Sequence, residues 1–309
     1  MGGTGGGSYT NWSQEKLTSD VRRDNRRSAA EFENELSLHL GELLASFNGR
    51  DVELVRERLD AAKSALEDTV EARLDQIYGG SVSKHTYVDG LSDIDSLLIV
   101  NGSEFENLDP PKVVQNMEKV LLKNFQGIAE VTHGHMAVTI TYPDGMSIQL
   151  LPAIRTEQGL KVPSPFGATW SEINPEGFTR ALTDTNNRCG RKLVPMIKLA
   201  KALISNLPEQ YQLSGYHVES LAIAAFRDYG GTHTTAAMLP YFFQRAKELV
   251  LAPIRDRTGQ SIHVDEYLGE ENSAQRHYIS RLLANLGKKM TNASAAQSWS
   301  QWEILFSGE

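Results

Sequence analysis

The sequence is poor in cysteine and in long apolar runs. Cys189 is the single cysteine among 309 residues, which excludes an intrachain disulfide and a zinc site built from several thiolates. A chain without disulfides suits a reducing compartment, so we expect a cytoplasmic location. No run approaches the roughly 20 apolar residues that a membrane-spanning helix needs. The opening MGGTGGGSYTNWS also lacks the charged and apolar regions of a signal peptide, and we expect no membrane partner.

Positive charge is also scarce. The 31 Lys and Arg residues are outnumbered by 39 Asp and Glu residues, and the formal net charge of −8 argues against a protein that coats duplex nucleic acid. One dense basic run, Arg22, Arg23, Arg26 and Arg27, is interpreted as a solvated segment rather than a polyanion site. The length fits one two-lobed enzyme or two modest domains, and the hydrophobic content of 40% is ordinary for a soluble globular protein.

The order of the periodic segments predicts an α+β fold. Residues 1–28, rich in Gly, Ser and Arg, are expected to form a flexible tail. Helical spacing follows over 28–47 and over 51–78, where a long amphipathic spine helix of roughly 40 Å is predicted at ~1.5 Å per residue. A helix near 112–124 precedes two strands that a Pro-Asp-Gly turn joins within residues 136–154. Beyond Pro163 helices are predicted at 176–183, 191–206, 216–229, 234–250 and 274–289.

The segment GGSVSKHTYVDGLSDIDSLLIV, residues 79–100, carries the chemistry. Its apolar end predicts a buried strand, on which Asp93 and Asp95 point to the same face. Two carboxylates there need partners, and a pair of divalent cations together with phosphate oxygens would supply them. Gly80 lets backbone amides approach phosphates, the Ser81 hydroxyl can donate to phosphate, and Lys84 can neutralise a triphosphate. A turn that merely starts a strand is the alternative.

The spacing of Gly80-Ser81 and Asp93-Ile94-Asp95 resembles the nucleotidyltransferase fold of the DNA polymerase β superfamily. More narrowly, the chain resembles the branch that holds oligoadenylate synthase, cyclic GMP-AMP synthase and the bacterial CD-NTases. IQLLPAI, VPMIKLAKAL and SGYHVESLA extend the resemblance over roughly residues 51–281. It implies a polymerase β-like nucleotidyltransferase lobe with a mixed sheet and spine helix (29–165) and an all-helical C-terminal lobe (166–309).

The resemblance also implies roles for individual residues. Asp93 and Asp95 would bind two Mg²⁺ (or Mn²⁺) ions for two-metal phosphoryl transfer. Other candidates would bind the nucleotide. Lys198 and Lys201 would face the triphosphate, Tyr216 would stack on a base, and Glu219 would form a hydrogen bond with a base edge. The two lysines could instead form a solvated stripe, and Tyr216 and Glu219 could be core and cap residues.

One position departs from the family pattern. Gln149 stands where the family has a third aspartate, and an amide carries no charge and is not a base. We expect Gln149 to share a sheet face with Ser147, Leu151 and the two aspartates. The histidines of HGH, His133 and His135, are interpreted as polar strand-end residues, with metal ligation as the alternative.

The resemblance predicts an enzyme that joins nucleoside triphosphates, ATP among them, into a cyclic di- or trinucleotide signal and releases pyrophosphate. In such systems the signal serves antiphage defence and activates a separate effector. Because one cysteine excludes a thiolate-rich zinc module, no obligatory nucleic-acid activator is expected. Two alternatives stay open. One is a catalytically silent nucleotide-binding protein, suggested by Gln149, and the other is a nucleotidyltransferase that modifies RNA, protein or a small molecule.

Overall fold

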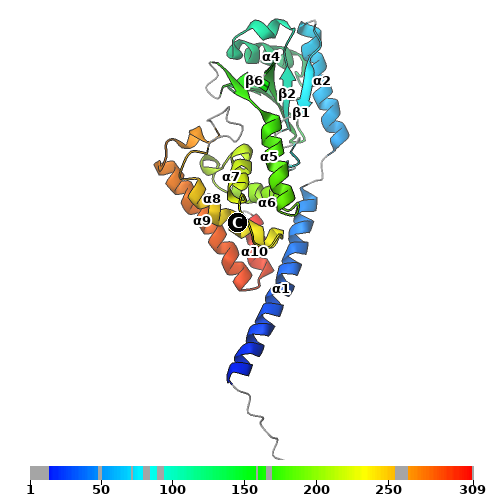
Figure 1. The fold of residues 1–309 in the computed structure, drawn as a ribbon. Coiled ribbons are helices and arrows are strands. Elements are labelled where there is room, and N and C mark those ends of the chain that lie inside the picture. The colour runs from blue at the N-terminus through cyan, green and yellow to red at the C-terminus, as the bar shows by residue number, and fades with distance from the viewer. Residues whose placement is uncertain are drawn as a thin grey trace, which may run out of the picture.

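The chain folds into a sheet lobe and a helical lobe, each with its own hydrophobic core (Figure 1). The computed structural model describes residues 14–47, 51–70, 72–78, 84–88, 94–157, 159–164, 169–254 and 264–307. In Figure 1 the sheet lobe lies above the helical lobe, and α5 lies where the two meet.

The seven described strands form one mixed sheet in the sheet lobe. Its central path runs β1-β2-β5-β4-β3, with β6 on β5 and β7 on β6. Only β2 and β5 are parallel among these pairs. The strands are β1 (Asp75–Tyr78), β2 (Ile94–Ile99), β3 (Glu130–His133), β4 (Val138–Thr141), β5 (Ser147–Thr156), β6 (Gly159–Pro163) and β7 (Trp170–Ile173).

Alternation along the strands divides the two faces of the sheet. Ile94 and Leu98 of β2 and Ile148 of β5 are buried in the core that α2 (Val52–Val70) and α4 (Pro110–Asn124) complete. The intervening residues Leu97 and Ile99 face the other way, where they form a smaller core with β6. Asp95 has the parity of Leu97, so its side chain lies on the face opposite α2 and α4.

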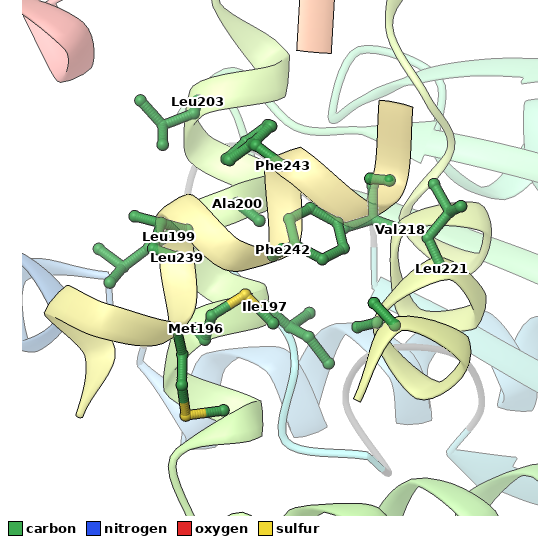
Figure 2. Close-up of a cluster of buried hydrophobic side chains, with 14 of the residues drawn as sticks. Met196, Ile197, Leu199, Ala200, Leu203, Val218, Leu221, Leu239, Phe242 and Phe243 are labelled. Carbon is green, nitrogen blue, oxygen red and sulfur yellow. The ribbon is translucent and has the colours of Figure 1, made fainter. Parts of the chain in front are cut away.

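The helical lobe is built from the remaining helices. Figure 2 shows its centre, where Met196 and Ile197 of α6, Val218 of α7 and Phe242 and Phe243 of α8 pack together. The helices are α1 (Gln14–Ser46), α5 (Pro175–Arg188), α6 (Leu193–Ser205), α7 (Gly215–Ala225), α8 (Thr235–Leu249), α9 (Ala274–Ala295) and α10 (Trp299–Ser307). Short 3₁₀ turns lie at Glu104–Asn107, Glu209–Tyr211 and Glu266–Leu268.

Helices from opposite ends of the sequence meet in this lobe. The His39 ring of α1 stacks on the Trp299 ring of α10 with centroids 4.4 Å apart. The Ser28 hydroxyl donates a hydrogen bond to Gln297 Oε1 at 2.8 Å. The first and last described helices therefore close the same core.

The spine helix predicted over residues 51–78 is too long. The helix ends at Val70, and Asp75–Tyr78 instead form β1, which pairs antiparallel with β2. The end of the helix could not be recognised from the apolar spacing, because Leu74 continues that spacing and is buried in the same core although it lies beyond the helix. The backbone N–H of Leu74 lies outside the helix and donates a hydrogen bond to the Glu67 carboxylate at 2.7 Å.

The predicted tail and lobe division also need correction. The first helix begins at Gln14, whereas helical spacing predicted a start at residue 28. Its Leu36 and Leu40 lie in the core of the helical lobe, although residues 29–47 were assigned to the sheet lobe. Strands β6 and β7 and helix α10 were not predicted. The α+β class, the mixed sheet and the helical C-terminal lobe are confirmed.

Candidate functional site

Asp95 and Gln149 stand side by side on the sheet. The parallel pairing of β2 with β5 sets Asp95 opposite Gln149, and β4 adds Thr139 to the same row. Paired residues on neighbouring strands share a face, and strands lie roughly 4.8 Å apart. The predicted orientation of Gln149 toward the Asp95 face is therefore confirmed. Both side chains are partly exposed, on the face opposite α2 and α4.

Three of the predicted site residues lie outside the described part of the chain. They are Gly80, Ser81 and Asp93. Asp93 directly precedes Ile94, the first residue of β2. Their roles stay predictions.

Four side chains from both lobes meet in what we call the inter-lobe cluster: Lys84, Thr86, Lys201 and Glu219. The Glu219 carboxylate of α7 accepts from Lys201 Nζ of α6 at 2.8 Å, and also from Lys84 Nζ and the Thr86 hydroxyl. Lys201 Nζ further donates to the Thr86 carbonyl oxygen at 3.1 Å. Thr86 is fully buried and Glu219 is 1% exposed. The cluster thus joins the segment that follows Gly80-Ser81 to two helices of the helical lobe.

Charge balance explains why a carboxylate is stable there. Burial alone would raise the pKa of the Glu219 carboxyl group, but the ammonium groups of Lys84 and Lys201 outweigh burial and hold the pKa below its usual value. Burial lowers the pKa of Lys201, and Glu219 opposes that shift. We take Glu219 as ionised at neutral pH, because it accepts three hydrogen bonds from the cluster.

The cluster favours the core alternative for Glu219 over contact with a base edge. A carboxylate that is buried and already accepts three hydrogen bonds has little capacity left for a base edge. Glu219 therefore lies in the structure as a core residue. Sequence reasoning missed Thr86, its neutral partner, although the resemblance segment KHT contains it.

Lys84 and Tyr216 pack against each other at the edge of the cluster. The Lys84 ammonium lies 4.7 Å from the Phe178 ring centroid and 5.2 Å from that of Tyr216. The two rings pack with centroids 4.6 Å apart. A Cβ atom at Gly215 would come within 3.2 Å of Lys201 Nζ, so the start of α7 leaves room for this ammonium by having glycine there.

Lys198 and Asp95 extend the charged region across both lobes. Lys198 is half-buried on α6, and burial together with Lys201 lowers its pKa. Asp95 opposes a small part of the lowering of the Lys201 pKa, so the β2 carboxylate acts on this lysine of α6. Asp95 and Lys198 therefore each interact electrostatically with Lys201.

A second buried polar cluster, unforeseen from the sequence, holds the start of α7. The Arg276 guanidinium donates to Asp265 Oδ2 at 2.7 Å and to several backbone carbonyl oxygens. Beside it, His217 Nδ1 lies 2.8 Å from the Tyr267 hydroxyl. The ring of His217 is fully buried, and burial lowers its pKa from 6.5 to about 4. His217 follows Tyr216 and precedes Glu219 by two residues, so this cluster supports the helix that carries Glu219.

The metal-ligand alternative for His133 is not supported. His133 pairs with Val138 in the ladder and so faces α4, where its Nδ1 lies 2.8 Å from Glu118 Oε1. That face is opposite the one that carries Asp95. Within the described ranges no group of three or more His, Cys, Asp or Glu side chains could hold a metal ion. None of the described helices is long and apolar enough to span a membrane.

Comparison with known proteins agrees with this geometry. Residues 44–186 match the family described as Second Messenger Oligonucleotide or Dinucleotide Synthetase domain (SMODS). No curated protein matches the chain. Among solved structures, the Bradyrhizobium diazoefficiens CD-NTase CdnG in complex with GTP is similar with a TM-score of 0.68 at 16% identity, covering 89% of this chain and 96% of that chain.

Two further structures share the architecture. The E. coli MS115-1 CdnC structure with ATP has a TM-score of 0.62 at 14% identity and covers 92% of this chain and 97% of that chain. The Vibrio cholerae DncV cyclic AMP-GMP synthase, in complex with a linear intermediate, has a TM-score of 0.62 at 11% identity and covers 96% and 90%. Residues 44–186 therefore carry the match to a SMODS domain, and the chain has the fold of these solved structures.

Proposed function

We propose that this protein condenses nucleoside triphosphates, with ATP as one of them, into a cyclic di- or trinucleotide and releases pyrophosphate. The observation that carries the proposal is the side-by-side placement of Asp95 and Gln149, within a lobe of the nucleotidyltransferase family. The product would activate a separate effector in antiphage defence. The solved relatives with GTP, ATP and a linear dinucleotide intermediate support a triphosphate substrate.

Each lobe supplies part of the proposed site. Gly80 and Ser81 would hold the triphosphate through backbone amides and a hydroxyl, and Lys198 would add positive charge from α6. Tyr216 would present a ring to a base. Phosphoryl transfer asks mainly for positioning and charge neutralisation, which such groups provide without covalent chemistry.

The described oxygens fit a hard divalent cation. Mg²⁺ is commonly bound by one or two carboxylates together with substrate phosphates, and a side-chain amide can offer its carbonyl oxygen. Asp93, Asp95 and Gln149 would hold two Mg²⁺ or Mn²⁺ ions, which when bound would neutralise the phosphates and lower the pKa of the attacking hydroxyl. Gln149 itself cannot accept that proton at neutral pH.

Gln149 also favours a second candidate, a nucleotide-binding protein without turnover. Asp95 has an amide for its neighbour in the ladder, and replacing a carboxylate by an amide removes one negative charge beside a cation. Cation binding at this position should therefore be weaker than with three aspartates.

The two candidates are separated by one experiment. Purified protein is incubated with four labelled nucleoside triphosphates and Mg²⁺ or Mn²⁺, and the products are treated with phosphatase and nuclease. A resistant product supports the cyclase, and tight binding without product supports the silent binder. Label transferred to added RNA, protein or a small acceptor would assign a different nucleotidyltransferase. The variant with Asp93→Asn and Asp95→Asn serves as the inactive control.

A further inference from the structure

We propose that Glu219 is a positioning residue: through the inter-lobe cluster it holds residues 84–88 against the helical lobe and thereby sets the geometry of the triphosphate site. The nucleotide part of this inference rests on the proposed function, whereas the docking of the segment does not.

Residues 84–88 contact both lobes at once. Tyr87 packs against the core of the sheet lobe. Lys84 and Thr86, by contrast, reach the carboxylate of Glu219 on α7. The segment begins with a turn at Lys84 and His85, where His85 has a φ of 58°, so side chains of one short segment can reach both lobes. The segment is therefore a bridge between them.

Its place in the sequence connects the bridge to the chemistry. Lys84 comes three residues after Ser81, and Val88 comes five residues before Asp93. In the sequence the bridge therefore lies between the two predicted motifs, and its docking is the step through which Glu219 would act on the triphosphate site.

Glu219 is the one anion of the inter-lobe cluster. It accepts from Lys84, Thr86 and Lys201, and Thr86 and Lys201 are also joined to each other. Without the negative charge of Glu219, the buried ammonium groups of Lys84 and Lys201 would lose the carboxylate that both contact, which is strongly unfavourable. Residues 84–88 would then detach from the helical lobe, so that the ammonium group of Lys84 becomes solvated.

This role differs from contact with a base in a measurable way. A residue that bonds a base edge affects one base more than another, because the edges differ in donors and acceptors. A residue that positions the triphosphate loop affects all nucleoside triphosphates by the same factor, since the triphosphate is common to them.

The test uses hydrogen exchange and nucleotide binding on Glu219→Gln, which keeps the shape of the side chain and removes the charge. Without nucleotide, exchange in peptides that cover residues 84–88 should rise roughly tenfold or more, while exchange in α8 and α9 stays the same. Affinities for ATP and GTP should fall by the same factor. Glu248→Gln, which removes an exposed ion pair with Arg245 on α8, is the matched control and should change neither measurement.

Lys84→Met gives a second route if Glu219→Gln does not fold. It removes the segment's own charge and leaves Glu219 paired with Lys201, so the same rise in exchange over residues 84–88 is expected. Unchanged exchange there in either variant overturns the proposal, as does a loss of affinity for only one base. If the wild-type protein binds no nucleotide, the proposed function fails, and the exchange measurement alone decides the role of Glu219.

Discussion

Acid should destabilise this protein through His217, well above the pH at which carboxylates titrate. Burial lowers the pKa of this imidazole from 6.5 to about 4 in the folded state. In the unfolded chain His217 is therefore protonated below pH 6.5, whereas in the folded protein it is protonated only below about pH 4. The contribution of neutral His217 is complete above pH 6.5 and is lost as the pH falls from 6.5 to 4.

The size of the effect follows from the same two values. A shift from 6.5 to about 4, at about 1.4 kcal/mol per pKa unit, gives a loss of about 3 kcal/mol in the free energy of unfolding. That is a large part of the 5–15 kcal/mol that is typical of native proteins. The structure supplies the reason: the ring is fully buried, and Arg276 adds positive charge nearby, while Asp265 at 3.8 Å offsets only part of this.

The measurement is urea unfolding at pH 7, 6, 5 and 4, followed by circular dichroism, on the wild type and His217→Gln. The glutamine does not titrate, so the variant should start less stable but should lose about 3 kcal/mol less between pH 6.5 and 4. The pKa of Glu219 is depressed, so its contribution is lost only as the pH falls from the usual carboxyl pKa of 4.5 toward the lower folded-state pKa, and this loss is common to both proteins. Equal slopes over pH 6.5 to 4 would refute the reasoning.

Four further outcomes are expected. Gln149→Asp should lower the Mg²⁺ concentration needed for half-maximal rate, because a carboxylate adds charge beside the cation; identical metal curves would mean that position 149 does not bind metal. Asp93→Asn with Asp95→Asn should abolish turnover and leave the thermal midpoint nearly unchanged, whereas retained activity would contradict the two-metal proposal. Lys198→Ala should weaken triphosphate binding more than thermal stability, and the reverse result would make this lysine structural. Arg276→Met leaves a buried carboxylate unpaired and should cost about 3–5 kcal/mol in urea unfolding; a cost below 1 kcal/mol would contradict the account of that cluster.

Local pattern was sufficient to predict the placement of the sheet residues. Ile94 and Ile148 mark one face of their strands, so the opposite parity of Asp95 and Gln149 follows from alternation alone. The Pro-Asp-Gly turn joined the correct strands for the same reason, since its neighbours alternate cleanly. Burial on one face leaves a strand little choice of register.

Partners distant in sequence could not be predicted in this way. Glu219 meets Lys84 across 135 residues, and His217 meets Tyr267 across 50. A helical pattern predicts which face of α7 is buried but not which charged groups lie against that face. The role of Glu219 could therefore not be assigned from the sequence to either a base contact or a core position. Leu74 shows the converse, because a correct apolar spacing continued past the true end of α2.

The contact between α1 and α10 has a consequence for synthesis on the ribosome. His39 of α1 stacks on Trp299 of α10, and Ser28 of α1 bonds Gln297, just before α10 and 269 residues away, so α1 emerges long before the surface that it finally covers exists. The sheet lobe, formed by residues 52–173, can complete its core in the meantime, since domains fold as units once their chain is available. Leu36 and Leu40 stay uncovered until α6 and α8, which α1 contacts, have been made. The nascent chain therefore carries α1 with its few apolar core residues uncovered for most of its translation.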